Sequence, residues 1–488
     1  MAEKNEKETN QPSKKKSKTS HKNIEFSIIT YMFLAIFIAM MIHLVYFNVV
    51  ESEEFINSYY NTRQEIFEKE VVRGDILSSE GYVLATTVTE ANGSEVRNYP
   101  YNQMFFHVVG YADCGKTGIE SLANFYLLRS NIFFTENITN ELQGEKDPGD
   151  NVITTLNFSL QEAAYKALGD YDGAVVVLEP STGKILAMVS KPDYNPNHVK
   201  EDWEYLTSED TDSSALVNRA TQGLYPPGST FKIITALEYM RENENYADYS
   251  YQCNGKYVVD NSKINCYNRI SHGNVNLEES FADSCNSSFA NIGTTLDITS
   301  WKSLCDQLLF NQKLPISFEY SMSSFSLDED ATTDDVLQTA IGQGKTLVSP
   351  MHMAMITAAI ANDGVLMSPY VVDHTENYKG VVVKQFEPSE YARLMTSEEA
   401  ATLEQYMAAV VDYGTADDLA DKAYEVYGKT GSAEFSSNTK SSHAWFVGYS
   451  HLEGKEDIAV AVVVEDSGSG SKYAVPIAEK IFDVYYQE

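Results

Sequence analysis

The pattern of apolar positions changes character along the 488 residues of the chain, and the longest apolar run lies near the start. Residues 27–50 read SIITYMFLAIFIAMMIHLVYFNVV and contain no Asp, Glu, Lys or Arg. As a helix these 24 residues span about 36 Å, which is enough to cross a bilayer with some tilt. The pattern therefore predicts one membrane-spanning helix.

The two flanks of this run differ in charge. Residues 1–26 are polar and carry seven lysines against four glutamates, whereas three glutamates follow the run at 51–54. Because basic flanks stay on the cytoplasmic side, we expect a cytoplasmic tail at 1–26, a signal anchor at 27–50 and the later residues outside the cell. A cleaved signal peptide is the alternative, but the run is long for one and no small-x-small cleavage site follows.

The next segment, residues 51–150, consists of shorter elements. Residues 51–72 have helical character, and we expect them to continue the membrane helix as a stalk. Short strand-like runs and turns fill 73–148, and the Gly/Pro/charge cluster GEKDPGD at 144–150 is typical of a domain boundary. The pattern predicts a small, β-rich extracellular pedestal at 51–150.

Residues 151–488 show a longer series of elements. GAVVVLEP and KILAMVS are apolar runs joined by STG, which is typical of a β-hairpin. Helical patterns follow at 228–241 and through most of 270–410; then come YEVYGKTGSAEF, HAWFVGYS and DIAVAVVVED, and a last helix. The hairpin and the three later runs can share one five-stranded antiparallel sheet with flanking helices and an inserted helical subdomain. We therefore expect an α+β fold.

Composition narrows the classes of function. A hydrophobic share of 43% is enough for a sizeable core, so a wholly disordered chain is excluded. The net charge of −34 repels phosphate backbones and argues against nucleic-acid binding.

The five cysteines are too few for a disulfide scaffold and form no CxxC pair; because no HExxH motif occurs either, we expect no metal site. Cys253 and Cys266 flank a hairpin-like stretch, and a disulfide between them stays open because the sequence does not give their separation. Cys285 is interpreted as a small buried hydrophobe. His272 is assigned a packing or hydrogen-bonding role.

Three short motifs carry the candidate chemistry: Ser229-x-x-Lys232, Ser284-x-Asn286 and Lys429-Thr430-Gly431. Each motif also recurs elsewhere, the first at Ser13, Ser181, Ser437 and Ser469, the second at Ser436 and the third at Lys116. Among the S-x-x-K copies, Ser229 alone falls at the first turn of an apolar helix, behind Pro-Pro-Gly. Positions i and i+3 share a helix face, so the Lys232 amine can reach the Ser229 hydroxyl.

These residue types fit nucleophilic catalysis. A serine hydroxyl needs a base, and a lysine serves as one when burial or a neighbouring cation such as Lys429 lowers its pKa. Ser284 can relay a proton to a leaving amine, and Asn286 can hold the lysine or a substrate amide. The backbone N–H groups of Ser229 and Ser432 can form an oxyanion hole, with Thr430 and Gly431 beside them on a substrate-binding strand.

The three motifs occur together in β-lactamases and penicillin-binding proteins, and the chain resembles a class B penicillin-binding protein. The resemblance covers nearly everything after residue 50. It also includes RGDI at 73–76, GYADCGKTGIE at 110–120, YPPGSTFK at 225–232, SHG at 271–273, SFADSCNSSF at 280–289, AIGQG at 340–344, VDYGTA at 411–416 and AWFVGY at 444–449.

The resemblance implies a monofunctional peptidoglycan D,D-transpeptidase. Ser229 would attack a stem peptide ending in D-Ala-D-Ala, an amine of a second stem would take the acyl group, and β-lactams would acylate the same serine. It also implies a dimerisation-like pedestal at 51–150, a transpeptidase domain at 151–488, a polytopic membrane glycosyltransferase as partner, and no metal or organic cofactor. The space before residue 150 is short for an attached glycosyltransferase domain, which argues against a class A bifunctional enzyme.

Two other functions stay open. One is a D,D-carboxypeptidase, a β-lactamase or a β-lactam-acylated sensor, which would share the acyl-serine chemistry. The other is a non-catalytic scaffold that activates a glycosyltransferase, against which the joint presence of all the motif residues argues. The sequence does not distinguish roles in septation, elongation and sporulation.

Overall fold

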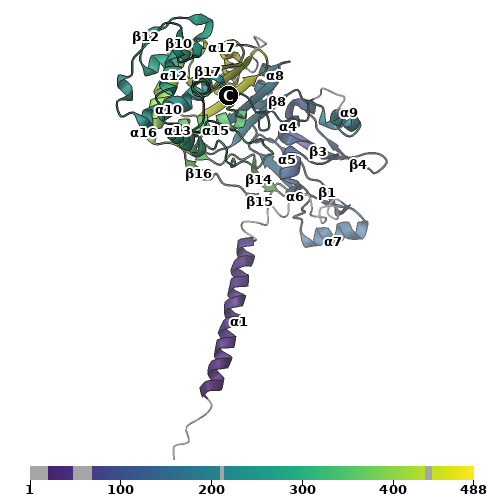
Figure 1. The fold of residues 1–488 in the computed structure, drawn as a ribbon. Coiled ribbons are helices and arrows are strands. Elements are labelled where there is room, and N and C mark those ends of the chain that lie inside the picture. Colours follow the sequence, from purple (N-terminus) through teal and green to yellow (C-terminus); the bar gives the residue numbers. More distant parts are fainter. Residues whose placement is uncertain (1–19, 48–68, 209–213, 435–441, 488) are drawn as a thin grey trace, which may run out of the picture. The chain divides into compact units, whose positions relative to one another are not determined.

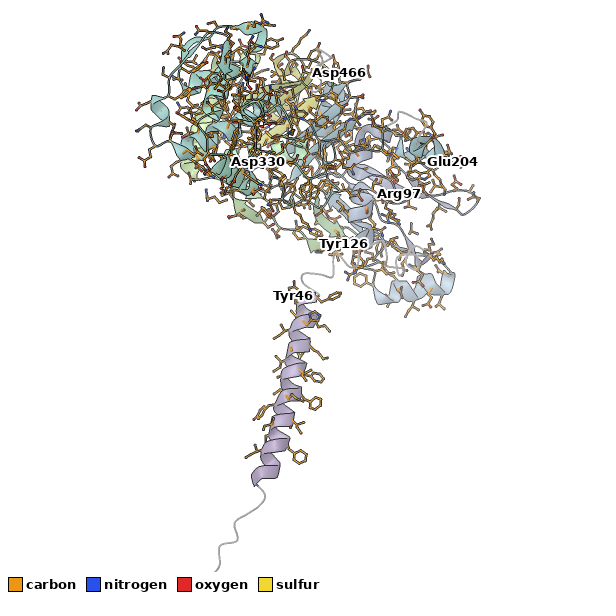
Figure 2. The ribbon with its side chains drawn as sticks, viewed as in Figure 1. Tyr46, Arg97, Tyr126, Glu204, Asp330 and Asp466 are labelled. Carbon is orange, nitrogen blue, oxygen red and sulfur yellow. The ribbon has the colours of Figure 1, made fainter. Side chains whose placement is uncertain are left out.

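The computed structural model describes residues 20–47, 69–208, 214–434 and 442–487. It divides into two compact units, Met1–Thr62 and Arg63–Glu488. In the first, helix α1 (Ser20–Tyr46) contains the 21-residue stretch Phe26–Tyr46, with a mean hydropathy of 2.4 and its side chains exposed. Figure 2 shows these side chains projecting around the helix as far as Tyr46.

This stretch is the one helix, within the described residues, that is long and apolar enough to cross a membrane. The predicted single apolar helix is therefore confirmed, although it begins a residue earlier than expected and residues 48–50 lie outside the described part. Most of the predicted tail at 1–26 and most of the predicted stalk at 51–72 also lie outside it.

The second unit is built on a five-stranded antiparallel sheet with the order β17-β18-β19-β7-β8. Its strands are β7 (Gly173–Leu178), β8 (Ile185–Lys191), β17 (Glu425–Glu434), β18 (Ser442–His451) and β19 (Ile458–Val464). The predicted hairpin and the three later runs thus form one sheet, as expected. Strand β17 lies at its edge.

Helices cover both faces of this sheet. Every residue of β7 and β19 is buried, which requires packing on the two faces to which successive side chains point. Helices α8 (Phe158–Leu168) and α18 (Val475–Gln487) pack against each other and the sheet, while α15 (Pro350–Ala361) packs on its central strands. Helix α15 is apolar on all sides and is buried along nearly its whole length.

The inserted helical subdomain lies between the hairpin and β17. Besides α15 and the short α9 (Trp203–Thr207), its helices are α10 (Lys232–Glu242), α11 (Leu277–Ala282), α12 (Asn286–Gly293), α13 (Ile298–Gln307), α14 (Thr333–Ala340) and α16 (Ser397–Asp412). The short helix α17 (Gly470–Tyr473) lies outside the insertion, between β19 and α18. Capping boxes at Asn276, Thr332 and Thr396 satisfy the first N–H groups of α11, α14 and α16. In Figure 1, α10, α12, α13 and α16 gather at one end of this unit.

Short strands complete the insertion. They are β9 (Tyr251–Cys253), β10 (Lys256–Val259), β11 (Ser262–Asn265), β12 (Gly273–Val275), β13 (Val365–Met367) and β16 (Glu390–Arg393). Strands β10 and β11 form an antiparallel hairpin, and β9 pairs with β12. These two pairs of strands lie, in sequence, between helix α10 and the Ser284 motif.

The N-terminal part of the second unit has a second sheet, with the order β15-β14-β6-β2-β3-β4. The strands of this sheet are β2 (Ile76–Leu77), β3 (Val83–Thr89), β4 (Glu95–Asn98), β6 (Asn151–Thr154), β14 (Val372–Glu376) and β15 (Val382–Gln385). Strands β1 (Val71–Val72) and β5 (Asp147–Pro148) form a separate parallel pair. The same part of the unit contains helices α4 (Phe106–Val109), α5 (Gly118–Leu122), α6 (Asn124–Leu127) and α7 (Phe134–Gln143). The helices were not foreseen from the pattern of short runs.

This sheet crosses the predicted boundary at residue 150. Strand β6 starts at Asn151 and lies between β2, which precedes the boundary, and β14, which comes from the region after it. The boundary itself stays a prediction, but hydrogen bonds of one sheet join the pedestal to the rest of the unit.

A buried ion-pair network holds the pedestal together. The Glu120 carboxylate has no exposed surface and bridges two arginines, with Oε2 2.6 Å from Arg73 Nε and Oε1 2.6 Å from Arg97 Nε. Arg97, labelled in Figure 2, also donates to Gly74 O at 2.8 Å. Burial raises the pKa of Glu120, but the two arginines outweigh it and hold the pKa below its usual value. The Arg-Gly-Asp tripeptide at 73–75 thus starts a structural network.

Glu120→Ala is expected to destabilise the second unit by about 3–5 kcal/mol, because it leaves two buried guanidinium groups without their partner. Urea unfolding of the detergent-solubilised chain measures this. The matched control is Glu95→Ala, whose partially exposed pair with Lys146 (2.9 Å) is expected to contribute at most about 1 kcal/mol. An effect of Glu120→Ala no larger than that of the control would contradict the assignment.

Candidate active site

The Ser229 motif lies on a turn that two glycines bring against the sheet. Ser229 belongs to the 3₁₀ turn Gly228–Phe231, which leads directly into α10 at Lys232. Gly228 has a φ of 55° and donates to Gly342 O at 2.8 Å, and a Cβ at Gly228 would lie 3.0 Å from the Ser432 carbonyl. The half-buried Ser229 is therefore fixed beside edge strand β17.

Lys232 points into a polar recess formed by the Ser284 motif. Its fully buried Nζ donates to Ser284 O at 2.7 Å, to Asn286 Oδ1 at 2.7 Å and to Ser284 Oγ at 3.1 Å. The ring centroid of Phe289 lies 5.3 Å from the same nitrogen. All three N–H donors of an ammonium group are thereby used.

Lys429 approaches the same hydroxyl from strand β17. Its buried Nζ donates to Ser284 Oγ at 3.0 Å and to Thr430 O at 3.1 Å, and the Phe281 ring centroid lies 5.6 Å away. The Ser284 hydroxyl is therefore in contact with two lysine amines, one from each side of the site. This arrangement suits a group that passes protons between them.

The backbone at Ser284 is held in an uncommon conformation. Ser284 has a φ of 52°, in the left-handed region that non-glycine residues seldom adopt. It lies between α11 and α12, where Ser284 N donates to Phe281 O at 3.1 Å and Cys285 N to Ser280 O at 2.9 Å. These bonds direct the Ser284 side chain and carbonyl toward Lys232.

The buried lysines carry shifted pKa values. Burial lowers the pKa of Lys232 to about 7, an effect that Cys285 and Cys266 partly oppose. Burial, together with the charge on Lys232, also lowers the pKa of Lys429 well below its usual value. Within the described ranges no carboxylate pairs with either amine. Burial and their mutual repulsion therefore disfavour simultaneous protonation of the two amines.

Residues that the motif search did not select complete the edge of the site. Gln343 Nε2 donates to Ser432 O at 3.2 Å, Thr415 and Thr430 share a hydrogen bond of 2.5 Å between their hydroxyls, and Gly470 N donates to Ser432 Oγ at 3.3 Å. Gln343 lies in the AIGQG segment and Thr415 in the VDYGTA segment. The resemblance of these two segments to the family was the feature of the sequence from which both residues could have been predicted.

The structure thus brings together Lys232, Ser284, Asn286 and Lys429 by direct hydrogen bonds, with Ser229 and Ser432 on adjoining backbone. Ser229 Oγ itself makes no hydrogen bond within the part of the chain that the structure describes, so the expected contact with Lys232 is not formed here. Catalytic hydrogen bonds are often long in unliganded sites and shorten when substrate binds.

The described copies of the motifs contribute no side chain to this hydrogen-bonded group. Ser181 sits in the turn between β7 and β8 and donates to Glu456 at 2.9 Å, Thr117 precedes α5, and Ser469 precedes α17. Ser13, Ser436 and Ser437 fall outside the described residues.

One group of possible metal ligands lies directly behind the Ser284 motif. Cys253, Cys266, His272 and Cys285 place their ligand atoms within 4.8 Å of one another. Cys253 and Cys266 are not disulfide-bonded; their Sγ atoms are 3.7 Å apart. The expectation from the sequence that no metal site exists rested on the absence of CxxC and HExxH motifs, and it overlooked this cluster.

A family model described as the penicillin-binding protein transpeptidase domain matches residues 173–483. The chain belongs to this family. A second family model, described as the penicillin-binding protein A dimerisation domain, matches residues 73–152 of the chain. The resemblance inferred from the sequence is thereby confirmed.

Individual relatives agree with this family. Peptidoglycan D,D-transpeptidase PbpA of Mycolicibacterium smegmatis is 31% identical over 434 residues, which are 83% of this chain and 87% of the relative. The solved D,D-transpeptidase domain of a peptidoglycan glycosyltransferase from Eggerthella lenta has a TM-score of 0.76 at 29% identity, covering 86% of this chain and 99% of that one. A ceftriaxone acyl-enzyme complex of penicillin-binding protein A from M. tuberculosis has a TM-score of 0.77 at 26% identity, with the same coverage.

Proposed function

We propose that the chain is a serine-type peptidoglycan D,D-transpeptidase that cross-links stem peptides through an acyl-serine intermediate and is acylated by β-lactams. The observation that carries this proposal is the Ser284 hydroxyl held between the buried amines of Lys232 and Lys429, beside the Ser229 turn. Relatives named D,D-transpeptidases, and a relative trapped as a β-lactam acyl-enzyme, support it.

In the acylation step, Ser229 Oγ attacks the carbonyl between the two D-Ala residues of the donor. Neutral Lys232 takes the hydroxyl proton, and the N–H groups of Ser229 and Ser432 stabilise the oxyanion. Ser284 relays a proton to the leaving D-Ala amine. The C–N bond breaks, free D-Ala departs, and the rest of the donor stays on Ser229 as an ester.

In the transfer step, an amine from a second stem attacks this ester and the Ser229 hydroxyl is regenerated. Lys429 acts earlier, when the intact donor binds: it pairs with the terminal carboxylate that later leaves with D-Ala, because a carboxylate next to a buried amine favours the protonated form of that amine. Asn286 holds Lys232, and Thr430, Gly431 and Ser432 supply the strand along which the peptide lies. No step requires a cofactor.

The cellular placement follows from the helix near the N-terminus. We assign α1 as a single-pass anchor with the basic tail in the cytoplasm and the catalytic unit outside the cell, where the peptidoglycan stems are. A polytopic membrane glycosyltransferase that supplies glycan strands is the proposed partner, with the pedestal as its docking module.

Product analysis tests transfer directly. With a donor peptide ending in D-Ala-D-Ala and a labelled amine acceptor, we expect a labelled amide product and one free D-Ala for each product formed. Hydrolysed donor without acceptor product would indicate a carboxypeptidase instead. Neither product, together with no acylation by penicillin, would indicate a non-catalytic scaffold.

The acylation rate is expected to rise with pH through about 7. The proposed base must be neutral, and the pKa of Lys232 is about 7, so acylation at pH 6 should be about tenfold slower than on the high-pH plateau. Labelling with a fluorescent penicillin, quenched at timed intervals between pH 5.5 and 9, measures the dependence of the acylation rate on pH. Thermal unfolding recorded at each pH is the control for folding. A flat profile, or one that falls as pH rises, would contradict Lys232 as the base.

A further inference from the structure

The stretch of chain before the Ser284 motif differs in charge from the rest of this acidic protein. The whole chain has 70 acidic and 36 basic residues, yet residues 249–277 contain one acidic residue, Asp260, against Lys256, Lys263 and Arg269. All three basic side chains are exposed. A local excess of positive charge on an otherwise acidic protein favours contact with an anionic ligand.

The β10–β11 hairpin places the two lysines on one outward face. Lys256 pairs across the strands with Asn265, and Val258 pairs with Lys263. These four residues are exposed, whereas Ile264, between Lys263 and Asn265 in the chain, is buried. Because successive side chains of a strand point to opposite faces, the two lysines and Asn265 share the exposed face.

The positive charges of this stretch are not neutralised by the protein itself. No ion pair among the described residues uses Lys256, Lys263 or Arg269. The one carboxylate of the stretch, Asp260, lies in the hairpin turn and accepts a hydrogen bond from Thr333 Oγ1 at 3.3 Å. The three cations are therefore available to a ligand.

The loop after β11 extends the exposed face and has an uncommon backbone. Asn268 and Arg269 have φ values of 48° and 57°, so two successive residues lie in the left-handed region. The loop is fixed, because Arg269 N donates to Cys266 O at 2.8 Å and a Cβ at Gly255 would lie 2.5 Å from Arg269 O. Tyr267 in the same loop is 67% exposed. A strained backbone that presents an exposed tyrosine and arginine is typical of ligand contacts.

Asn286 connects this exposed face to the catalytic lysine. Its Oδ1 accepts from Lys232 Nζ at 2.7 Å, and its Nδ2 donates to Asn265 O at 3.1 Å, at the end of β11. In Figure 1, β10 and β12 lie at the same end of the second unit as α10 and α12. Since the donor in the proposed mechanism lies along β17, on the Lys429 side, the hairpin side is left for the second stem.

We propose that Lys256, Lys263, Tyr267 and Arg269, here called the basic face, bind the acceptor stem peptide whose amine attacks the acyl-enzyme. An acceptor stem that ends in D-Ala carries a terminal carboxylate, which lysine and arginine bind through charge-assisted hydrogen bonds. The Tyr267 ring covers apolar parts of the same peptide. Holding the acceptor here raises the effective concentration of its amine at the Ser229 ester. This inference rests on the proposed function and names the site of its second substrate.

Two acceptor peptides that differ only at the C-terminus test the basic face in the full, detergent-solubilised chain. One ends in a free carboxylate and the other in a carboxamide, and both carry the same attacking amine and label. For the wild type we expect a KM for the carboxylate acceptor that is about tenfold lower than for the carboxamide, the sum of several exposed charge contacts.

Neutral variants assign that difference to residues. Lys256→Gln, Lys263→Gln and Arg269→Gln should each raise the KM of the carboxylate acceptor by about two- to fivefold, and the triple variant should not distinguish the two acceptors. The matched control Lys302→Gln, at an exposed lysine of α13, should retain the wild-type difference. Penicillin acylation and the thermal unfolding midpoint are recorded for each variant, because a merely structural role of the hairpin would lower both.

The outcomes separate the basic face from the proposed function. Transfer to both acceptors with equal KM in the wild type would overturn the basic face alone, and would be the result if its natural ligand were a phosphate polymer instead of a stem peptide. Variants that slow penicillin acylation as much as transfer would also overturn it, since the hairpin would then act through Asn286. If the wild type forms no transfer product with either acceptor, the proposed function fails together with this inference.

Discussion

Ser229→Ala abolishes covalent labelling by a fluorescent penicillin and leaves the chain folded: this is the largest effect that we expect. The hydroxyl is the acylated atom in the proposed mechanism, and the substitution removes one oxygen that makes no hydrogen bond within the described residues. Gel fluorescence after denaturation measures the labelling, and an unchanged thermal unfolding midpoint shows that the fold is intact.

The matched control for Ser229 is Ser181, the serine of a recurring S-x-x-K motif that the structure places in the turn between β7 and β8. Ser181→Ala should label like wild type, because this serine contacts neither Lys232 nor Lys429. Persistent labelling of Ser229→Ala, or loss of labelling in Ser181→Ala, would contradict the assignment of the nucleophile.

Lys232→Ala is expected to slow acylation by about 10²–10⁴-fold, the usual effect of removing a positioned general base. Lys232→Arg gives the sharper comparison. A guanidinium keeps the positive charge but does not deprotonate at these pH values, so this variant should be as slow as Lys232→Ala. The measurement is the second-order rate constant for penicillin acylation at pH 8.

Two results would overturn the base assignment. One is a near-wild-type rate in Lys232→Arg, which would mean that a fixed charge and not proton transfer is what the site needs. The other is a near-wild-type rate in Lys232→Ala. Asn286→Asp serves as a control for the recess, because the aspartate still offers an oxygen acceptor to Lys232. Its negative charge should raise the pKa of Lys232, so the rise of the acylation rate should move to higher pH.

The large sheet could be predicted because its strands carry strong local signals. Strands β7, β8 and β19 are continuous apolar runs bounded by turn residues, and both of their faces are buried. The apolar length of α1 was likewise visible without any tertiary information. Ser229 was selected over its copies for the same kind of reason: a Pro-Pro-Gly turn followed by an apolar helix.

The second sheet could not be predicted in the same way. Strands β14 and β15 alternate apolar and polar residues only weakly. Strand β15 pairs with β14, which in turn pairs with β6 across more than 200 residues of chain. Helices α5 and α6 are one turn each, so they show no helical period. Long-range pairing of this kind is decided by tertiary contacts that a local pattern does not contain.

The cysteine and histidine cluster was missed for a related reason. Its ligands come from four separate elements, and no two stand at the short spacing on which metal-site patterns depend. The paired contacts of Ser284 were also beyond reach, because the left-handed conformation that aims its side chain between two lysines is a property of the folded loop.

The most direct test of the central claim is the site of covalent attachment in the wild-type chain. After reaction with a β-lactam and proteolysis, mass spectrometry should find one adduct per chain, carrying the full mass of the opened β-lactam. It should lie on the peptide that contains YPPGSTFK, with fragmentation placing it on Ser229. An adduct on any other residue, or an unmodified Ser229 peptide in fully reacted protein, would contradict the account.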